Sequence, residues 1–114
     1  MVILPMKSFA TDPTALSIDR LNRAGYLVKR IRGPFGLCGI GLLPGTGIAV
    51  CVVNNAREKI EILVRLLGNL KVRAAAQEMV LQLHHWHNLP DGSKYCEVIE
   101  IVPADFTAKR KRRA

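Results

Sequence analysis

The stretch PFGLCGIGLLPGTGIAVCVVNNARE, residues 34–58, decides the expected fold. Two short apolar runs, at 37–43 and 47–53, flank a Pro-Gly-Thr-Gly turn, and a helix start follows near Asn55. Short apolar runs bounded by Gly and Pro are typical of buried strands joined by turns. The stretch therefore predicts a hairpin of two buried strands that leads directly into a helix.

The segment before this hairpin predicts a helix and a further strand. Asp12 and Pro13 form a good N-cap and first-turn pair, and Gly25 favours a left-handed stop, so we expect a helix at 13–24. The following YLVKRIR, residues 26–32, has the β-branched and aromatic content of a strand. Alternation along that strand places Arg30 and Arg32 on one face.

The segment after the hairpin changes to a helical period. Apolar residues recur at i, i+3, i+4 and i+7, which predicts an amphipathic helix with these residues toward the core: Ile60, Leu63, Val64 and Leu67. Glu61 and Arg65 have the spacing of a surface ion pair. Gly68 could end this helix, or the alanine-rich segment behind it could continue the helix to about residue 77. Propensity alone does not decide between the two.

Two strands complete the expected order. MVLQLHHW, residues 79–86, and YCEVIEIV, residues 95–102, are rich in strand-forming residues and are separated by a turn-rich connector. The order is then α-β-β-β-α-β-β, a single α/β (α+β) domain with a central mixed sheet flanked by helices. We expect an N-terminal arm at 1–11, the domain at 12–103 and a basic flexible tail at 104–114. The expected buried residues are Leu27, Ile31, Leu37, Ile40, Val50, Val52, Ile60, Leu63, Leu67, Val80 and Leu83.

Positive charge is the clearest compositional feature. The chain has 17 Lys and Arg against 9 Asp and Glu, a net charge of +8, and without the five cations of the tail the net charge is +3. These five are Lys109, Arg110, Lys111, Arg112 and Arg113. A cationic tail attracts phosphates through counterion release without reading bases, so DNA, or else RNA, is the expected partner. A solubilising terminus or a targeting signal is the alternative.

The sequence shows no pattern for a membrane span, a nucleotide cofactor or nucleophilic catalysis. No apolar run approaches the roughly 20 residues of a span, and the Gly-rich turns match neither a Walker loop nor the dinucleotide fingerprint. The serines, Ser17 among them, lack a paired base. Cys38, Cys51 and Cys96 lack metal-ligand spacing and are interpreted as buried reduced thiols. We expect no cofactor, no membrane and no small-molecule substrate, and a cytoplasmic or host-cell nucleoid-associated protein.

The order α-β-β-β-α-β, the phrase LNRAGYLVKRIRG ahead of a Gly-rich hairpin, and NNAREK at a helix start resemble the small PD-(D/E)XK nucleases, especially the archaeal Holliday-junction resolvase branch. The resemblance covers about residues 14–87 and implies a restriction-endonuclease-like fold. It also implies a Mg²⁺ site. An aspartate at the start of the second strand and a Glu-x-Lys triplet closing the third would bind the metal and orient the attacking water.

The residues that would bind Mg²⁺ in that family are absent from this sequence. The aspartate position falls on Gly36, the glutamate on Val52 and the lysine on Asn54. A hard cation needs anionic oxygen ligands, and a lone Asn54 amide does not replace two carboxylates. The resemblance therefore implies a pseudoenzyme, a nuclease-like scaffold that does not cleave and that would need Mg²⁺ only if displaced acids made it active.

The tetrapeptide HHWH at 84–87 is a second candidate site. On a strand His85 and His87 point the same way, a spacing found in zinc and copper sites. A third ligand would then come from Cys96, Asp91 or Glu97. We favour the alternative without metal, a polar strand end whose imidazoles face solvent or phosphate.

Two hypotheses of different classes follow. The first is a protein that holds the DNA backbone without cleavage, through the tail and through Arg30, Arg32, Arg57 and Lys59. The second is an interaction protein whose second helix or sheet edge makes a homodimer or docks on a larger complex. A third is an active metal-dependent nuclease with displaced acids. Net charge favours the first, and the missing acids count against the third. Trp86 could pack in the core or at the sheet edge under any of the three hypotheses. Under the first hypothesis it could instead stack against a base.

Overall fold

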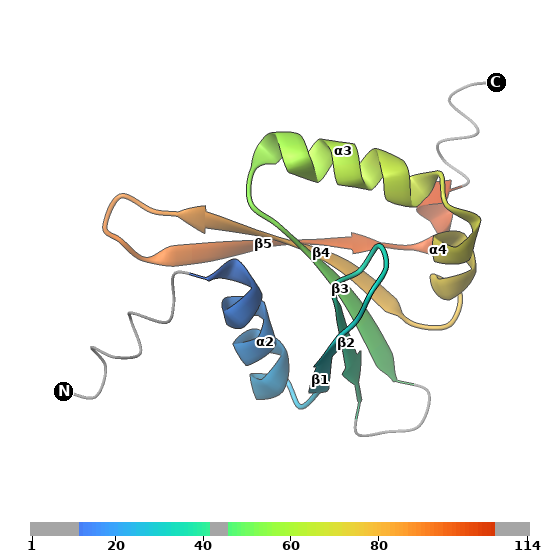
Figure 1. The fold of residues 1–114 in the computed structure, drawn as a ribbon, viewed down its shortest axis with the longest axis horizontal. Coiled ribbons are helices and arrows are strands. Elements are labelled where there is room, and N and C mark those ends of the chain that lie inside the picture. Colours follow the sequence, from blue (N-terminus) through green and yellow to red (C-terminus); the bar gives the residue numbers. More distant parts are fainter. Residues whose placement is uncertain (1–11, 42–45, 107–114) are drawn as a thin grey trace.

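A five-stranded mixed sheet in the order β1-β2-β3-β4-β5 forms the centre of the computed structural model, which describes residues 12–41 and 46–106 (Figure 1). The strands are β1 Leu27–Arg30, β2 Leu37–Ile40, β3 Gly47–Val53, β4 Val80–Asn88 and β5 Lys94–Ile101, and the helices are α2 Pro13–Arg23, α3 Ala56–Leu67 and α4 Leu70–Ala75. Neighbouring strands are antiparallel except β3 and β4, because α3 and α4 form the crossover between those two. The expected α+β class and order of elements are confirmed, with the crossover helix in two pieces.

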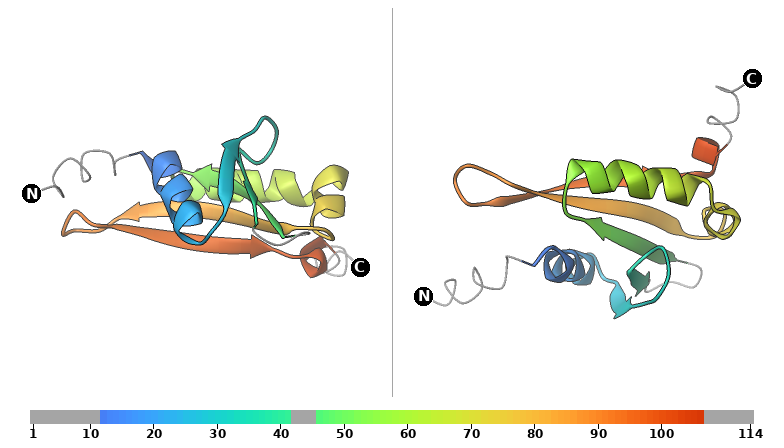
Figure 2. Two further views of the ribbon diagram at one scale, coloured as in Figure 1. Left: turned by 90° about the horizontal axis from the view of Figure 1, so that it is seen from below. Right: turned by 45° about the horizontal axis from the view of Figure 1, so that its top comes forward.

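The two faces of the sheet are covered by different helices. Figure 2 shows α2 on one side of the sheet and α3 on the other. Side chains of β3 alternate between these sides, so Val50 packs in a small core with Leu21 of α2, whereas Cys51 and Val53 pack in a larger core with Leu66 of α3. Each residue of β3 and β4 can therefore be assigned to the α2 side or the α3 side.

Local capping fixes where the helices begin and end. The Asp12 carboxylate accepts a hydrogen bond from the Thr14 backbone N–H at 3.0 Å, and Gly25 has a φ of 97°, so the expected start and stop of the first helix are confirmed. Gly68 ends α3, and the Asn69 side chain caps α4 by accepting from two backbone N–H groups. The alternative of one continuous helix to residue 77 is therefore wrong.

The buried and exposed faces of α3 are not the ones that the apolar spacing predicted. Ile60 and Val64 are 61% and 58% exposed, so their expected burial is wrong, while Leu66 is buried. Leu63 and Leu67 are half-buried against the core as expected. Helix α3 thus presents to the core a face rotated from the one predicted, with Leu66 inward and Ile60 and Val64 outward. The expected Glu61–Arg65 ion pair is also wrong, because Glu61 pairs with Arg57 at 3.1 Å.

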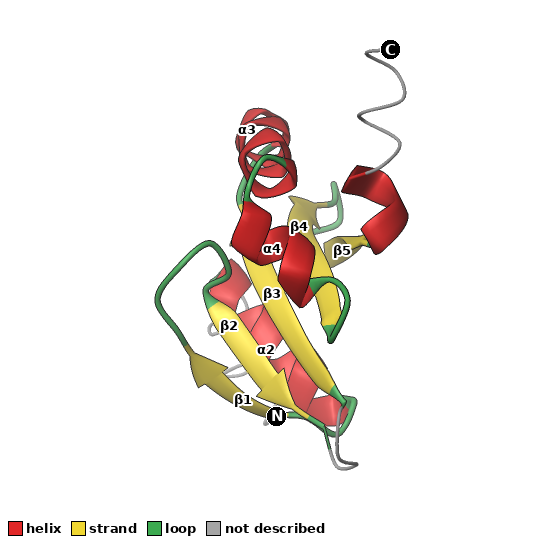
Figure 3. Ribbon diagram, turned by 90° about the vertical axis from the view of Figure 1, so that its right-hand side faces the viewer, coloured by secondary structure: helices red, strands yellow, loops and turns green. Residues whose placement is uncertain are grey.

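The β1 edge of the sheet is less buried than expected. Leu27 is 68% exposed and Ile31 and Ile40 are also exposed, so their predicted burial is wrong. The register pairs Leu27 with Ile40, and alternation places both on the α3 side, away from the small core that Val28 joins. Figure 3 shows β1 and β2 extending away from α3, which explains the exposure. Val80, at the start of β4, is exposed as well, against expectation. Leu37, Val50 and Leu83 are buried as predicted, and Val52 is half-buried.

The C-terminal end of the described chain continues past the expected boundary at 103. Residues 103–106 form a helical turn, and Phe106 is buried in the larger core. The five tail cations at 109–113 lie outside the described residues. No helix within the described ranges has the length and apolar character required to cross a membrane.

Candidate functional site

Strand β4 carries the three histidines and Trp86 in alternation. His84 and Trp86 face α2, whereas His85 and His87 face α3, because successive strand residues point to opposite sides. The HHWH tetrapeptide is therefore two separate sites on opposite faces of the sheet. His84 and His85 are buried, so the expectation that the imidazoles face solvent or phosphate is wrong for these two. The sequence HHWH indicates two opposite faces only after residues 84–87 have been assigned to a strand.

On the α2 side, Ser17 connects the helix to the strand. Ser17 Oγ lies 2.8 Å from His84 Nδ1, and the indole Nε1 of Trp86 donates to the same Oγ at 2.8 Å. The Nε2 atom of His84 lies 2.9 Å from the Gln82 side-chain oxygen. A neutral His84 with its proton on Nε2 satisfies all of these contacts, since the Ser17 hydroxyl then donates to Nδ1 and Nε2 donates to Gln82.

This network corrects the expectation that Ser17 has no paired base. The pairing does not make Ser17 a nucleophile, because both Ser17 and His84 are completely buried and no reacting group could reach the hydroxyl. Burial, with a smaller contribution from the positive charge of Arg20, lowers the pKa of His84 to about 4. The imidazole is therefore neutral at pH 7, and its chemistry is structural: it orients Ser17, which in turn orients the Trp86 indole.

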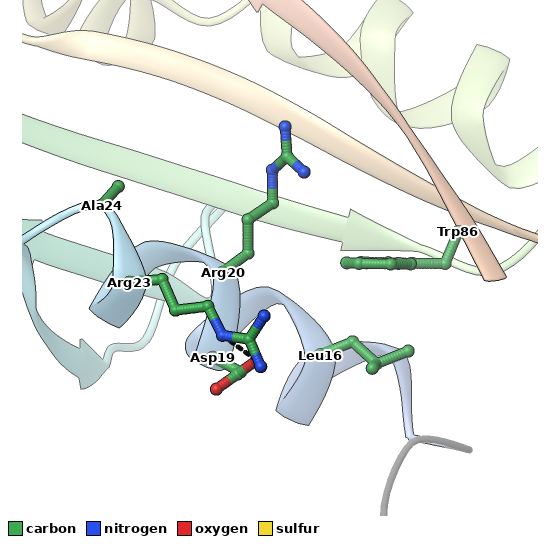
Figure 4. Close-up of a pocket in the computed structure, with 6 residues that line it drawn as sticks. All are labelled: Leu16, Asp19, Arg20, Arg23, Ala24 and Trp86. Atoms are coloured by element: carbon green, nitrogen blue, oxygen red, sulfur yellow. Dashed lines mark ion pairs between the residues drawn. The ribbon is translucent and has the colours of Figure 1, made fainter. Parts of the chain in front are cut away.

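The oriented Trp86 side chain lines a pocket beside α2. The pocket has a volume of about 590 Å³ and is lined by Leu16, Asp19, Arg20, Arg23, Ala24 and Trp86. Figure 4 shows the Trp86 indole extending toward the Arg20 side chain, with the Arg23–Asp19 ion pair below. Within the described parts of the chain, Arg20 makes no side-chain hydrogen bond or ion pair. We call this the α2 pocket; it combines a fixed aromatic ring with an uncompensated positive charge.

The cations expected to hold nucleic acid are divided between the two faces. Arg30 faces the α2 side on the exposed edge strand, but β1 ends there and Arg32 follows in an exposed loop, so the expectation that both arginines share one strand face is wrong. Arg57 and Lys59 lie on α3, across the sheet, where each is paired with a carboxylate. Arg20 and Arg23 were not predicted, although their spacing of three residues on a helix places them on neighbouring turns of the same side.

The three positions aligned with nuclease metal ligands lie at the same end of the β2–β3 hairpin. Gly36 immediately precedes β2, Val52 lies in the last part of β3, and Asn54 immediately follows β3. The acid nearest in sequence, Glu58, accepts a hydrogen bond from the Asn54 backbone N–H at 2.9 Å while Asn55 accepts from the Glu58 N–H at 2.8 Å. This reciprocal pair caps α3, so the Glu58 carboxylate is committed to a helix start.

On the α3 side, three side chains converge on one carboxylate. Glu97 of β5 lies directly across from His85, and its Oε1 atom is 3.3 Å from His85 Nδ1, 3.1 Å from His87 Nε2 and 3.3 Å from Lys59 Nζ. Hydrogen bonds from His87 and then Lys59 hold the pKa of Glu97 below its usual value. Burial, followed by the charges of His87 and Lys59, lowers the pKa of His85. We call these four residues the histidine cluster.

The structure selects among the candidate partners that the sequence left open. Of Cys96, Asp91 and Glu97, only Glu97 joins His85 and His87, since the register places Cys96 opposite Trp86 and on the α2 side. Cys96 and Cys38 are half-buried free thiols, and Cys51 is buried. Burial raises the pKa of the Cys51 thiol to about 11, with a smaller contribution from Glu58, so it stays protonated at pH 7.

Comparison of the chain with family models, with curated proteins and with solved structures found no match in any of the three.

Proposed function

We propose that this protein binds nucleic acid without cleaving it, through the α2 pocket and the cationic C-terminal tail. The observation that carries the proposal is the α2 pocket, in which Trp86 lies beside Arg20 and Arg23. An aromatic ring stacks on any base, and arginines bind backbone phosphates without reading sequence. The pocket volume of about 590 Å³ is large enough for a nucleotide.

The charge of the protein supports binding to a polyanion. Five of the 17 cations of the chain lie at 109–113, and Arg30 is exposed on the same side of the sheet as the α2 pocket. The tail would supply affinity through counterion release, and the α2 pocket would hold an unpaired base beside the phosphates. Single-stranded DNA or RNA is therefore the favoured ligand over a closed duplex, whose bases are stacked. Arg57 and Lys59 are left out of this interface because they lie on α3, on the opposite face of the sheet.

In this proposal the protein has a nuclease-like fold but lacks the carboxylates needed for metal-dependent cleavage. The order of elements, with a parallel β3–β4 pair after two antiparallel pairs, supports it. The aligned positions Gly36, Val52 and Asn54 have no carboxylate to offer, so we expect no Mg²⁺-dependent cleavage. We propose that the protein acts in the cytoplasm or bound to the nucleoid of a host cell.

Fluorescence anisotropy on the full chain would test this function. Single-stranded, duplex and branched DNA and single-stranded RNA, each with an end label, are titrated at several salt concentrations. Replacement of Arg20 and Arg23 by Gln should weaken single-strand binding about tenfold or more, and Trp86→Leu should remove roughly 1–3 kcal/mol of stacking. Incubation with Mg²⁺ should leave every substrate intact.

A matched control separates the α2 pocket from net charge. The double variant Arg57→Gln, Arg65→Gln also removes two positive charges, but from α3 on the opposite face of the sheet. The control should bind nearly as well as the unmodified protein. If both double variants lose affinity equally, the α2 pocket has no special role, and if the unmodified chain binds no nucleic acid at low salt, the proposed function fails.

A second candidate function, assembly with another protein surface, is favoured by the exposed face of α3. Ile60 and Val64 are one helical turn apart and both point to solvent. Neighbouring exposed aliphatic side chains can form part of an apolar surface that binds another protein. Sedimentation of the full chain and of Ile60→Lys would test it, since a homodimer through this face should dissociate in the variant, and a monomeric parent chain would count against self-assembly.

A further inference from the structure

We propose that His85, His87 and Glu97 form a binding site for a single Zn²⁺ ion on the α3 side of the sheet. Their ligand atoms all lie within 4.8 Å of one another, and within the described residues they form the one group of three or more His, Cys, Asp or Glu side chains with this geometry. The two histidines come from alternate positions of β4, and Glu97 comes from the directly paired position of β5. Three donors are therefore fixed by the hairpin backbone.

The two distances that join Glu97 to the histidines match those in a tetrahedral metal site, and all ligand atoms lie within 4.8 Å of one another. An ion with bonds of about 2.0–2.1 Å holds neighbouring ligand atoms roughly 3.3 Å apart. Glu97 Oε1 lies 3.3 Å from His85 Nδ1 and 3.1 Å from His87 Nε2. An ion could thus bind with small side-chain rotations and without movement of the strands.

His85 supplies an independent reason to expect a ligand. Its side chain is only 5% exposed, and its buried Nδ1 atom lies 3.3 Å from Glu97 Oε1 but makes no well-aligned hydrogen bond. A buried ring nitrogen without a well-aligned hydrogen bond is costly, whereas a metal bond would satisfy it. His87 and Glu97 are more exposed, so an ion could enter from solvent and keep a fourth position for water.

The donor set selects the metal. Two imidazole nitrogens and one carboxylate suit Zn²⁺ and related transition metals, whereas Mg²⁺ and Ca²⁺ prefer all-oxygen ligands. The site therefore differs in metal and in position from the Mg²⁺ site of the nuclease family that the sequence resembles. The α2 pocket lies across the sheet, so metal binding can be measured independently of nucleic acid.

In the histidine cluster the Lys59 ammonium group is the positive charge that neutralises the Glu97 carboxylate. Its ammonium group donates to both oxygens of Glu97, at 3.3 and 3.4 Å. A Zn²⁺ ion would displace this ammonium, because two positive groups would otherwise lie against one carboxylate. Lys59 thus competes with the metal, and its removal should strengthen Zn²⁺ binding. A cluster that is only an ion-pair network would not respond in this way.

Calorimetry of the metal-stripped full chain with ZnCl₂ tests the site. We expect one ion per chain at about micromolar Kd, weaker than closed four-ligand sites. Glu97→Gln and His87→Ala should each weaken binding at least tenfold, and Lys59→Met should tighten it roughly tenfold. Glu100→Gln, an exposed acid on the opposite face of β5, is the matched control and should leave the affinity unchanged.

Nitrogen NMR of the imidazole rings identifies the ligands directly. Zn²⁺ should shift the ring nitrogens of His85 and His87 and leave those of His84, which are hydrogen-bonded to Ser17 and Gln82 on the other face. Circular dichroism without metal checks that each variant is folded. The proposal is overturned if the chain takes up no Zn²⁺ at about 100 μM, far above the expected Kd, if Glu100→Gln weakens binding as much as Glu97→Gln, or if the rings of His85 and His87 do not shift.

Discussion

Ser17 and His84, 67 positions apart in the sequence, share a buried hydrogen bond of 2.8 Å that joins the first helix to the fourth strand. The same hydroxyl accepts from Trp86 Nε1 at 2.8 Å, so one small side chain satisfies two polar groups of the strand. This relationship gives the Trp86 indole its fixed position at the α2 pocket. It makes Ser17 a structural residue whose removal should affect both stability and the pocket.

Ser17→Ala should destabilise the fold by about 2–3 kcal/mol, because it leaves His84 Nδ1 and Trp86 Nε1 without partners. Ser93→Ala is the matched control, since its hydroxyl bonds only to Asp91 in an exposed turn, and it should cost less than about 1 kcal/mol. Urea unfolding followed by tryptophan fluorescence measures both. Equal losses in the two variants would contradict a special role for Ser17.

Stability should fall as the pH is lowered from 7 toward 4. The folded-state pKa of His84 is lowered to about 4 from 6.5, so within this window the unfolded chain binds a proton that the folded chain does not. The unfolded state is then favoured at lower pH, by up to about 3 kcal/mol, and the dependence from this group ends below pH 4. The lowered pKa of His85 acts in the same direction. Unfolding free energies at a series of pH values should show the slope, and His84→Gln should flatten it whatever its effect at pH 7.

Two glycines at the β2 strand should respond oppositely to alanine. A Cβ at Gly39 would lie 2.7 Å from Ile48 Cγ2 and 3.1 Å from Tyr26 Cβ, whereas a Cβ at Gly36 would meet nothing within 4 Å. Gly39→Ala should therefore cost about 1–3 kcal/mol, while Gly36→Ala should be neutral or stabilise by up to about 1 kcal/mol. Thermal unfolding would measure both, and a destabilised Gly36→Ala together with a neutral Gly39→Ala would show that the strand packing is different.

Local features of the fold were predictable from the sequence, and the choice of buried face was not. Asp12, Gly25 and the Asn55 start of α3 act within a few residues, so the sequence contains the information that fixes them. Burial of Ile60 or of Leu66 depends on where the helix lies on the sheet, which involves residues far along the chain. The same reason explains Leu27: alternation was correct, but the helix that covers one side does not extend over β1.

In the candidate sites, too, local spacing was predictable from the sequence, whereas contacts between distant residues were not. The spacing of His85 and His87 is local and identified a pair on one face, but three candidates remained for the third ligand until the β4–β5 register selected Glu97. The Ser17–His84 contact could not be predicted, because no periodicity links two residues so far apart. The α2 pocket was missed because it needs Trp86 and the α2 arginines to be brought together by the fold.

The orientation of α3 gives a direct test of its corrected buried face. Leu66→Ala should cost about 2–5 kcal/mol because it leaves a cavity in the larger core, whereas Ile60→Ala should cost less than about 0.5 kcal/mol because that side chain faces solvent. Leu66 is 1% exposed. Chemical denaturation of both variants measures the difference, and the reverse order of effects would favour the stripe predicted from the sequence.

Deletion of residues 109–114 tests how much of the nucleic-acid affinity comes from the tail. Five clustered cations can displace several condensed counterions, at roughly 0.7 units of slope per phosphate contact on a single strand, so the truncated chain should lose up to about 3.5 units from its log–log salt dependence on single-stranded ligands. Arg30→Ala with Arg32→Ala should further weaken what remains, since both side chains are exposed near the β1 edge. The Arg20 and Arg23 variants should lower affinity with a smaller change of slope, because they make at most two phosphate contacts. If truncation leaves the salt slope unchanged, the tail does not contact the backbone, and the α2 pocket alone would have to account for the binding.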